Sequence, residues 1–302
     1  MKIAAVTIFC NELFRLQNWK TYYEEYSSEI YYHVIVNNGR VEDCDVLKDS
    51  FPKSIVVHSQ TKNMVASYNL GFQTALANPE VDVVMQITND IRFEYGAITK
   101  LYDKLMSDSK LALIGPVVLK KDSEIIESFG YIFRHHYGNG RPLFRNCPYS
   151  DLREPFIYVS SIPGGAIMIK RECYDKFGAQ DENLFMYADE RDMFIRYENL
   201  GYREGVLCTA KAWHQHIFPK GKGRRSTTAF FLTARNRIYI AAKHNPFYIA
   251  LGEFAIRFIV AFMQYAHHII IFQPEKKAIN WATIRGLWYG ILGRMDNSFM
   301  EQ

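Results

Sequence analysis

The chain has 302 residues, of which 48% are hydrophobic and 23% are charged. This composition excludes an intrinsically disordered chain, a collagen and a disulfide-rich miniprotein, and the length suits one large domain or two small ones. Lysine and arginine number 36 against 32 acidic residues, so the net charge is only +4 and no nucleic-acid partner is expected.

The cysteines and the N-terminal residues point to a cytoplasmic protein. The five cysteines are scattered, odd in number and without a C-x-x-C pair, so they predict neither a disulfide framework nor a zinc ribbon. The apolar run 3–9 is too short for a signal peptide and lacks its cleavage site, so we interpret it as a buried strand.

Short apolar runs alternate with helical patterns over the first 120 residues. The pattern predicts strands at 3–9, 31–36, 54–58, 81–87 and 111–119, with helices ending near 26 and covering 65–77 and 96–106. Such alternation is typical of an α/β fold with a mainly parallel sheet covered by helices on both faces. Ligands of these sheets bind beyond the carboxyl ends of the strands, so the residues after each strand become candidates.

The middle of the chain is less regular. Residues 128–155 are rich in Gly, Pro, Tyr and His and predict a loop or hairpin excursion. Strands are expected at 157–161 and 166–170, on either side of Pro163-Gly164-Gly165, and helices at 171–178 and 185–199.

Residues 246–302 differ in character from the rest. A helix over 247–272 would confine its polar side chains to one stripe roughly 100° wide; these are Glu253, Arg257, Gln264, His267 and His268. The remaining apolar face fits burial in the protein, a homodimer interface or a bed in the membrane interface. Residues 205–252 contain no acid and several basic residues, which favours contact with anionic lipid. A spanning helix is not expected, because the apolar run is interrupted.

Two acidic clusters are candidates for chemistry. Asp90 closes the triplet Thr88-Asn89-Asp90 after a strand, where a carboxylate suits a divalent cation that holds a diphosphate, or else caps the next helix. Asp189 and Glu190 lie on the predicted helix 185–199. Acidic residues are favoured in the first turn of a helix by the helix dipole, which is one explanation for this pair. The other is that one of the two acids is a general base, and their position in the sequence does not distinguish the two explanations.

A third cluster is basic. His214 and His216 are two apart, so on an extended chain both imidazoles would face one side; the plainer interpretation is that they are structural or exposed. Arg224 and Arg225 lie in a Gly-rich basic loop, which either meets an anion or is simply solvated.

These features occur in an order that resembles glycosyltransferase family 2, in its rhamnosyltransferase-like branch of surface-polysaccharide glycosyltransferases. The segments 163–171 and 177–192 resemble the family's signature over about 40 residues. Asn63 to Gly71 resembles its N-x-G-x-x-x-x-N-x-G element, and Thr88-Asn89-Asp90 the N-P-D form of its D-x-D motif. Trp213-His214 and 233–237 match further elements, so the resemblance extends over most of residues 1–245.

The resemblance implies a GT-A fold for residues 1–245, followed by an amphipathic helical extension at 246–302. It implies a nucleotide-sugar donor, a divalent ion, Mg²⁺ or Mn²⁺, and sugar transfer with inversion. Asp90 and His214 would hold the metal, and Asp181 would lie near the acceptor. Other positions carried over contact the donor: Thr7, Asn11, Asn37 and Asn63 at the nucleoside, and Gly164 and Gly165 at the sugar. Arg224, Arg225 and Arg235 are the cations expected to share the diphosphate charge.

Four positions depart from the family pattern. Thr88 replaces the first acid of D-x-D, Val65 replaces a glycine, and Asn37 replaces an aspartate. The Glu-Asp pair is inverted to Asp189-Glu190, so the base is Glu190 by alignment and Asp189 by residue type. We favour Glu190.

The expected function is an inverting, metal-dependent glycosyltransferase of surface polysaccharide biosynthesis. Its acceptor would be a saccharide linked to polyprenyl diphosphate, which places the enzyme peripherally on the inner face of the cell membrane. One alternative, a sugar nucleotidyltransferase, needs a Gly-rich loop after the first strand, where this chain has Cys10-Asn11-Glu12-Leu13. The other, a non-catalytic carbohydrate-binding module, is motivated by the departures at Thr88 and Glu190.

Overall fold

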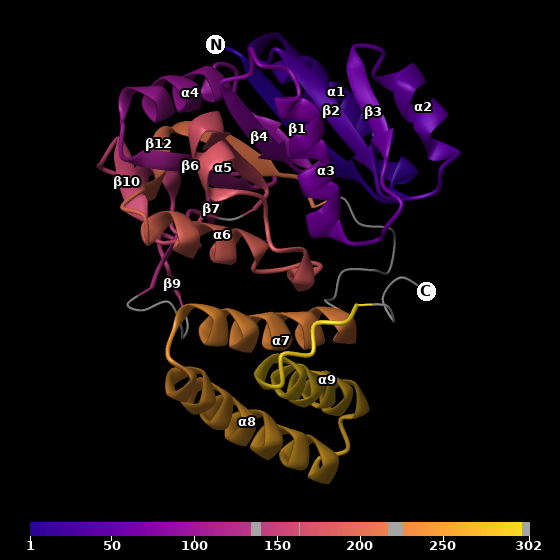
Figure 1. The fold of residues 1–302 in the computed structure, drawn as a ribbon, viewed down its shortest axis with the longest axis vertical. Helices are drawn as coiled ribbons and strands as arrows, with labels where there is room; N and C mark the ends of the chain where they lie inside the picture. Colours follow the sequence, from indigo (N-terminus) through magenta and orange to yellow (C-terminus); the bar gives the residue numbers. More distant parts are fainter. Residues whose placement is uncertain (134–139, 163, 217–225, 298–302) are drawn as a thin grey trace.

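The computed structural model describes residues 1–133, 140–162, 164–216 and 226–297. Ten strands of this part form one mixed sheet, in the order β10-β12-β6-β11-β4-β1-β2-β3, with β5 paired to β12 and β7 to β6 (Figure 1). Their bounds are β1 Ile3–Phe9, β2 Tyr32–Asn37, β3 Ser54–His58, β4 Val83–Ile87, β5 Ile91–Phe93, β6 Leu111–Lys120, β7 Ile126–Ser128, β10 Phe156–Val159, β11 Ala166–Lys170 and β12 Arg203–His214. A separate two-stranded ribbon joins β8 (Tyr131–Ile132) and β9 (Arg141–Pro142) within the irregular middle segment.

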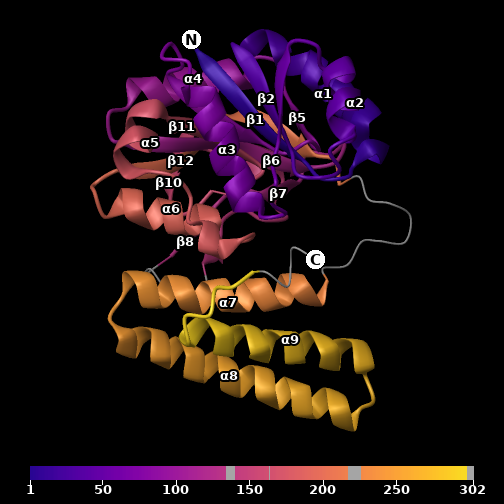
Figure 2. The same ribbon diagram turned by 45° about the vertical axis from the view of Figure 1, so that its right-hand side comes forward.

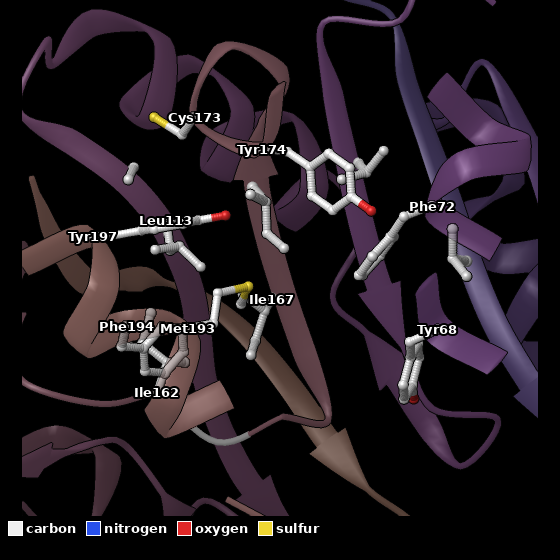
Figure 3. Close-up of a cluster of buried hydrophobic side chains, with 14 of the residues drawn as sticks. Tyr68, Phe72, Leu113, Ile162, Ile167, Cys173, Tyr174, Met193, Phe194 and Tyr197 are labelled. Atoms are coloured by element: carbon white, nitrogen blue, oxygen red, sulfur yellow. The ribbon is translucent and has the colours of Figure 1, made fainter. Parts of the chain in front are cut away.

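Helices cover both faces of the sheet, as the alternating pattern predicts. They are α1 Leu16–Tyr26, α2 Asp43–Ser50, α3 Met64–Leu76, α4 Ala97–Ser107, α5 Arg171–Phe177 and α6 Asp189–Glu198. On one face α3, α5 and α6 contribute Phe72, Tyr174 and Phe194 to a buried apolar cluster (Figure 3). On the other face α4 packs Leu101 and Leu105 against the sheet. The prediction of a mainly parallel sheet flanked by helices is confirmed.

The parallel pairing of β1 with β2 and β4, and of β2 with β3, brings the carboxyl ends of these four strands to one edge. Here α3 packs closely on β1, since a β-carbon added at Gly71 would lie 2.3 Å from a methyl group of Val6. Only glycine, which has no β-carbon, allows α3 and β1 to lie this close together. With α3 held against β1, the start of α3 lies near the carboxyl end of the strands.

Two antiparallel strands bring later parts of the chain to this edge. β11 runs antiparallel to β4 with Ala166 opposite Ile87, so the glycine pair before β11 lies beside the end of β4. β12 runs antiparallel to β5 with His214 opposite Ile91, so its last residue lies beside the residues that follow β4. This topology assembles residues from four distant parts of the sequence.

Three helices form a layer beside the sheet domain: α7 (Thr227–His244), α8 (Phe247–Ile270) and α9 (Pro274–Ile291) (Figures 1 and 2). α9 packs closely on α7, because β-carbons added at Gly286 and Gly290 would lie 2.3 and 2.5 Å from carbonyl oxygens of α7. On its other side α7 is bonded to the sheet domain, where the amide of Asn236 donates to the carbonyl oxygens of Leu184, Met186 and Tyr187. The helical layer thus begins before the boundary expected at residue 246.

The outward side of α8 is apolar. Its buried residues are Ala250, Phe254 and Ala261, whereas large apolar side chains along its length are exposed, among them Ile256, Ile259, Val260, Phe262, Met263 and Ile270. By length and composition α8 is also capable of crossing a membrane, which the sequence analysis did not expect. However, α8 packs along α7 and α9, and α7 is fixed to the sheet domain. We therefore interpret α8 as a helix at the surface of the molecule.

Candidate functional site

Asp90 lies at the strand-end edge, between β4 and β5, and is only 5% exposed. Its Oδ2 atom lies 3.3 Å from Nε2 of His214 and 3.3 Å from a guanidinium nitrogen of Arg15. The backbone N–H of Gln215 donates to the Asp90 carbonyl oxygen at 2.9 Å, which continues the pairing of β12 with β5. The end of β12 is therefore held against Asp90 by backbone as well as side-chain contacts.

A second carboxylate lies on the far side of His214. Glu127, in β7, has Oε1 at 2.9 Å from Nδ1 of His214 and at 2.7 Å from Nε2 of His216. Ligand atoms of these three residues lie within 4.8 Å of one another, so the group could hold a metal ion. Both imidazoles thus face one acidic group at the same edge as Asp90.

The charges at this cluster are strongly coupled. Burial lowers the pKa of His214, but its hydrogen bonds to Asp90 and Glu127 outweigh burial and raise the pKa to about 9. Burial opposes ionisation of Asp90, and the hydrogen bond from His214 outweighs it, so the pKa of Asp90 falls below its usual range. Two carboxylates around an imidazolium form a site where a divalent cation can replace the proton, and these donor types fit Mn²⁺ or Mg²⁺.

The acid pair lies at the first turn of α6, preceded by Ala188 in the left-handed region with φ 64°. Glu190 contacts Gly164 so closely that a β-carbon on residue 164 would lie 1.6 Å from its Oε1. The glycine loop is fixed in turn to the end of β4: Gln86 donates to the Gly164 carbonyl at 2.7 Å, and the N–H of Thr88 donates to that of Gly165 at 2.9 Å. Glu190 is thereby connected to the Thr88-Asn89-Asp90 triplet through one short loop.

Tyr68, near the start of α3, lies close to both the acid pair and Asp90. Burial raises the pKa of its hydroxyl, and the negative charges of Asp189, Glu190, Asp90 and Glu12 raise it further. All four carboxyl groups are therefore near enough to this buried hydroxyl for their charges to act on it. Asp90, expected at the metal, and Glu190, expected as the base, therefore lie on the same side of the molecule.

The acid pair differs from ordinary surface carboxylates. Burial raises the pKa of both acids, and the neighbouring charge of Asp189 raises that of Glu190 further. Asp189 is buried, whereas Glu190 is partly exposed. An acid with an elevated pKa and access to solvent is suited to proton transfer near neutral pH.

Three of the asparagines carried over by the resemblance hold backbone at this edge. The Asn37 amide donates to the Arg40 carbonyl at 2.7 Å, and its oxygen accepts from the N–H of Gly39 at 2.9 Å. Asn11 accepts from the N–H of Arg40 at 3.1 Å, so both side chains close the turn after β2. Asn63 caps α3 by accepting from the backbone N–H groups at 65 and 66.

Three other predicted residues, Thr7, Arg235 and Asp181, make contacts within the fold. Thr7 is fully buried and its hydroxyl lies 2.9 Å from His33, so it does not line an open nucleoside site. Arg235 is fully buried and donates to the carbonyls of Asn183 and Leu184, so it holds that loop to α7 instead of facing a diphosphate.

Asp181 is likewise engaged within the fold. Its Oδ2 accepts from the hydroxyl of Tyr239 at 2.9 Å and from Lys243 at 2.7 Å, both on α7. This ties the helical layer to the sheet domain and leaves acceptor binding without support at this position. Arg224 and Arg225, with Pro163, lie outside the described residues.

Two residues that were not predicted from the sequence, Arg15 and Glu127, also lie at the site. Arg15, in a short 3-10 helix at Leu13–Arg15, donates to Asn89 at 3.0 Å as well as contacting Asp90. Glu127 lies between the predicted strand at 111–119 and the irregular segment that begins at 128, where no element was expected. The signal for Arg15 was available, since Glu12 and Arg15 are three apart directly after the first strand; nothing in the sequence marked Glu127.

Comparison with solved structures identifies the fold, whereas comparison of the sequence with known families and proteins finds no match. No protein-family model matches this sequence, and no curated protein matches it. The structure is similar to the crystal structure of GalNAc-T7 with UDP, GalNAc and Mn²⁺, with a TM-score of 0.60 and 12% sequence identity, over 80% of this chain and 48% of that chain. The chain therefore spans about half the length of that neighbour. The chain has the GT-A fold, and at this identity the likeness shows the fold alone.

Proposed function

We propose that the protein is a metal-dependent glycosyltransferase that moves a sugar from a nucleotide-sugar donor to a saccharide acceptor. The observation that carries this proposal is the grouping of Asp90 and His214 with Glu190 at one strand-end edge, around the Gly164-Gly165 loop. The GT-A fold and the UDP and Mn²⁺ bound by its neighbour support it. The resemblance to the rhamnosyltransferase-like branch stays part of the proposal.

The metal-side residues are Asp90 and His214. Nε2 of His214 faces Asp90 while Nδ1 faces Glu127, so Glu127 orients the ring and leaves Nε2 for a metal, as carboxylates do behind many histidine ligands. When bound, Mn²⁺ or Mg²⁺ supplies positive charge for the departing nucleoside diphosphate. Arg15 contributes a guanidinium beside Asp90, the role that the sequence analysis had assigned to Arg235.

Glu190 is the general base of the proposed reaction. It takes the proton from the acceptor hydroxyl as the oxygen of that hydroxyl attacks the anomeric carbon and the bond to the diphosphate oxygen breaks. A single displacement of this kind inverts the anomeric configuration. Burial raises the pKa of Glu190, and the charge of the neighbouring Asp189 raises it further. Gly164 and Gly165 provide backbone without side chains at the donor sugar, and Asn11, Asn37 and Asn63 shape the turns on the nucleoside side.

The outward apolar face of α8 supports membrane contact on the cytoplasmic side, with a polyprenyl-diphosphate-linked acceptor in surface polysaccharide synthesis. Phe262 and Met263 are more than half exposed, and Ile256, Ile259 and Val260 on the same helix are exposed as well. A homodimer through the same face is the competing outcome. The two are separated by whether the chain binds vesicles or associates with itself in their absence.

The experiment is a donor panel with the purified full chain and Mn²⁺. UDP-, GDP- and dTDP-sugars are supplied with saccharide acceptors, and the released nucleotide is identified. Release of a nucleoside diphosphate that is lost in Glu190→Gln, with an inverted product, supports the proposal. Pyrophosphate release would make the protein a nucleotidyltransferase, and donor binding without any turnover would make it a binding module.

A further inference from the structure

A cavity of about 380 Å³ lies within the helical layer, between α7, α8 and α9. It is on the side of α7 that faces away from Arg235 and Asn236, which bind the sheet domain. Its polar lining comes from Arg237 on α7, from Thr283 on α9 and from the polar stripe of α8, namely Glu253, Arg257 and Gln264. The cavity is therefore separate from the acid pair and from the cluster at Asp90.

Part of the polar stripe of α8 lines the cavity, whereas on a surface helix of a soluble protein the polar stripe faces water. In such a helix polar residues face water and apolar residues face the neighbours. Here Glu253, Arg257 and Gln264 line the cavity, while Ile256 and Val260 are 64% and 50% exposed and also form its wall. The cavity thus joins a polar interior to the outward apolar face.

The charge inside the cavity is not balanced. Glu253 is paired with Arg257 through the i,i+4 contact on α8. Arg237 has neither a hydrogen bond nor an ion pair among the described residues, although it is partly buried. Burial and, after it, the charge of Arg257 lower the pKa of Arg237 to about 10, against the opposing charge of Glu253. A guanidinium held away from water beside a second one needs an anion.

The lining residues and the volume of the cavity indicate what kind of anion it would bind. Two arginines offer paired N–H donors that match phosphate oxygens, and the volume falls in the range of small-ligand sites. Ile256 and Val260 line the cavity and are also exposed on the outside of α8, so a bound molecule that extends past them meets apolar side chains. An anionic head with an apolar tail satisfies both surfaces.

We infer that this cavity binds the phosphate group of an anionic membrane phospholipid, with Arg237 and Arg257 on the phosphate and the acyl chains along Ile256 and Val260. The lipid would hold the helical layer at a defined depth in the membrane surface. This binding requires no glycosyl transfer, because α7 separates the cavity from the acid pair.

The test measures binding of soluble short-chain lipids to the full chain by calorimetry. Dihexanoyl phosphatidylglycerol, dihexanoyl phosphatidylcholine and inorganic phosphate are compared below the micelle concentration of the lipids. We expect phosphatidylglycerol to bind most tightly and its affinity to fall about tenfold in Arg237→Gln, as for loss of a charge-assisted hydrogen bond. Lys277→Gln, an exposed change of the same charge on α9, is the matched control and should leave affinity unchanged.

Several outcomes would overturn the inference. Equal affinity for inorganic phosphate would make this a free-phosphate site, and an equal loss in Lys277→Gln would make the attraction a general surface charge. Unchanged binding in Arg237→Gln would remove the cavity from any lipid contact. Arg237→Lys keeps the charge and should retain most of the affinity, and melting curves of both Arg237 variants show whether the helical layer remains folded.

Discussion

The carboxylate of Glu190 occupies the space that a side chain on residue 164 would need, since a β-carbon on Gly164 would lie 1.6 Å from Glu190 Oε1. Gly164→Ala should therefore displace this carboxylate from the glycine loop. We expect kcat to fall roughly 100-fold through loss of general-base geometry, with a stability cost of only about 1 kcal/mol, because a flexible side-chain end gives way. Steady-state kinetics and thermal unfolding measure the two effects.

The neighbouring glycine provides the matched control. A β-carbon on Gly165 would meet its nearest atoms at 3.6 Å, which is ordinary contact. Gly165→Ala leaves the Glu190 carboxylate in place, so kcat should be largely kept, and any loss should appear in KM for the donor. Equal loss in both variants would mean that the loop tolerates no side chain at all, and the specific contact between Glu190 and Gly164 would have no catalytic meaning.

The pH dependence of transfer tests the role of Glu190. A general base must be ionised, and burial together with Asp189 raises the pKa of Glu190 above its usual range. The rate should accordingly rise with pH through this elevated pKa. Asp189→Asn removes the neighbouring negative charge, so the pKa of Glu190 should fall and the rising limb should move to lower pH. A profile of kcat against pH for both proteins checks this, and an unshifted limb would remove Asp189 from the pair.

Metal binding should release a proton from His214. The pKa of His214 is raised to about 9, so at pH 7 the ring is charged and a cation must displace its proton. Affinity for Mn²⁺ should rise about tenfold per pH unit between pH 7 and 8 and level off above pH 9, since one proton is lost per ion. Calorimetry in buffers of different ionisation enthalpy counts that proton. His214→Gln should abolish the release; a proton-independent affinity in the native chain would place the ion elsewhere.

Much of the sheet could be predicted from the sequence, because buried strands leave an uninterrupted apolar run. The strands at Ile3–Phe9, Ser54–His58 and Ala166–Lys170 match their predicted ranges. The long strand Arg203–His214 was not predicted, because a Lys and a Thr interrupt it and its pairing with both β6 and β5 is non-local. α2 also escaped notice, since its eight residues are mostly polar.

The site was predictable only where its residues follow strands. Asp90 follows a strand of the parallel sheet, so its place at the edge could be argued from topology. Glu127 reaches His214 only because β7 pairs with β6, which no local pattern reveals. Arg235 was expected at the diphosphate because of its charge, and its burial against backbone carbonyls could not be foreseen from the sequence.

If the outward apolar face of α8 binds a membrane, introducing one negative charge on that face should weaken the binding. Phe262→Glu places a carboxylate on this face, where the side chain is 54% exposed, and should lower affinity for anionic vesicles about tenfold or more. Leu200→Glu makes a similar change at a residue that is 57% exposed on the turn after α6, and should have little effect. Sedimentation with vesicles checks both. Gel filtration without lipid shows whether Phe262→Glu instead dissociates a dimer, the result that would contradict membrane contact.

The central claim is that Asp90 and Glu190 act on the same donor from two sides of one cleft. The most direct measurement is nucleoside diphosphate release by Asp90→Asn over a titration of Mn²⁺, beside the exposed control Asp45→Asn. The account predicts loss of release in Asp90→Asn at every metal concentration, with unchanged thermal unfolding and normal release in the control. Release that continues at the native rate and metal dependence in Asp90→Asn would contradict it.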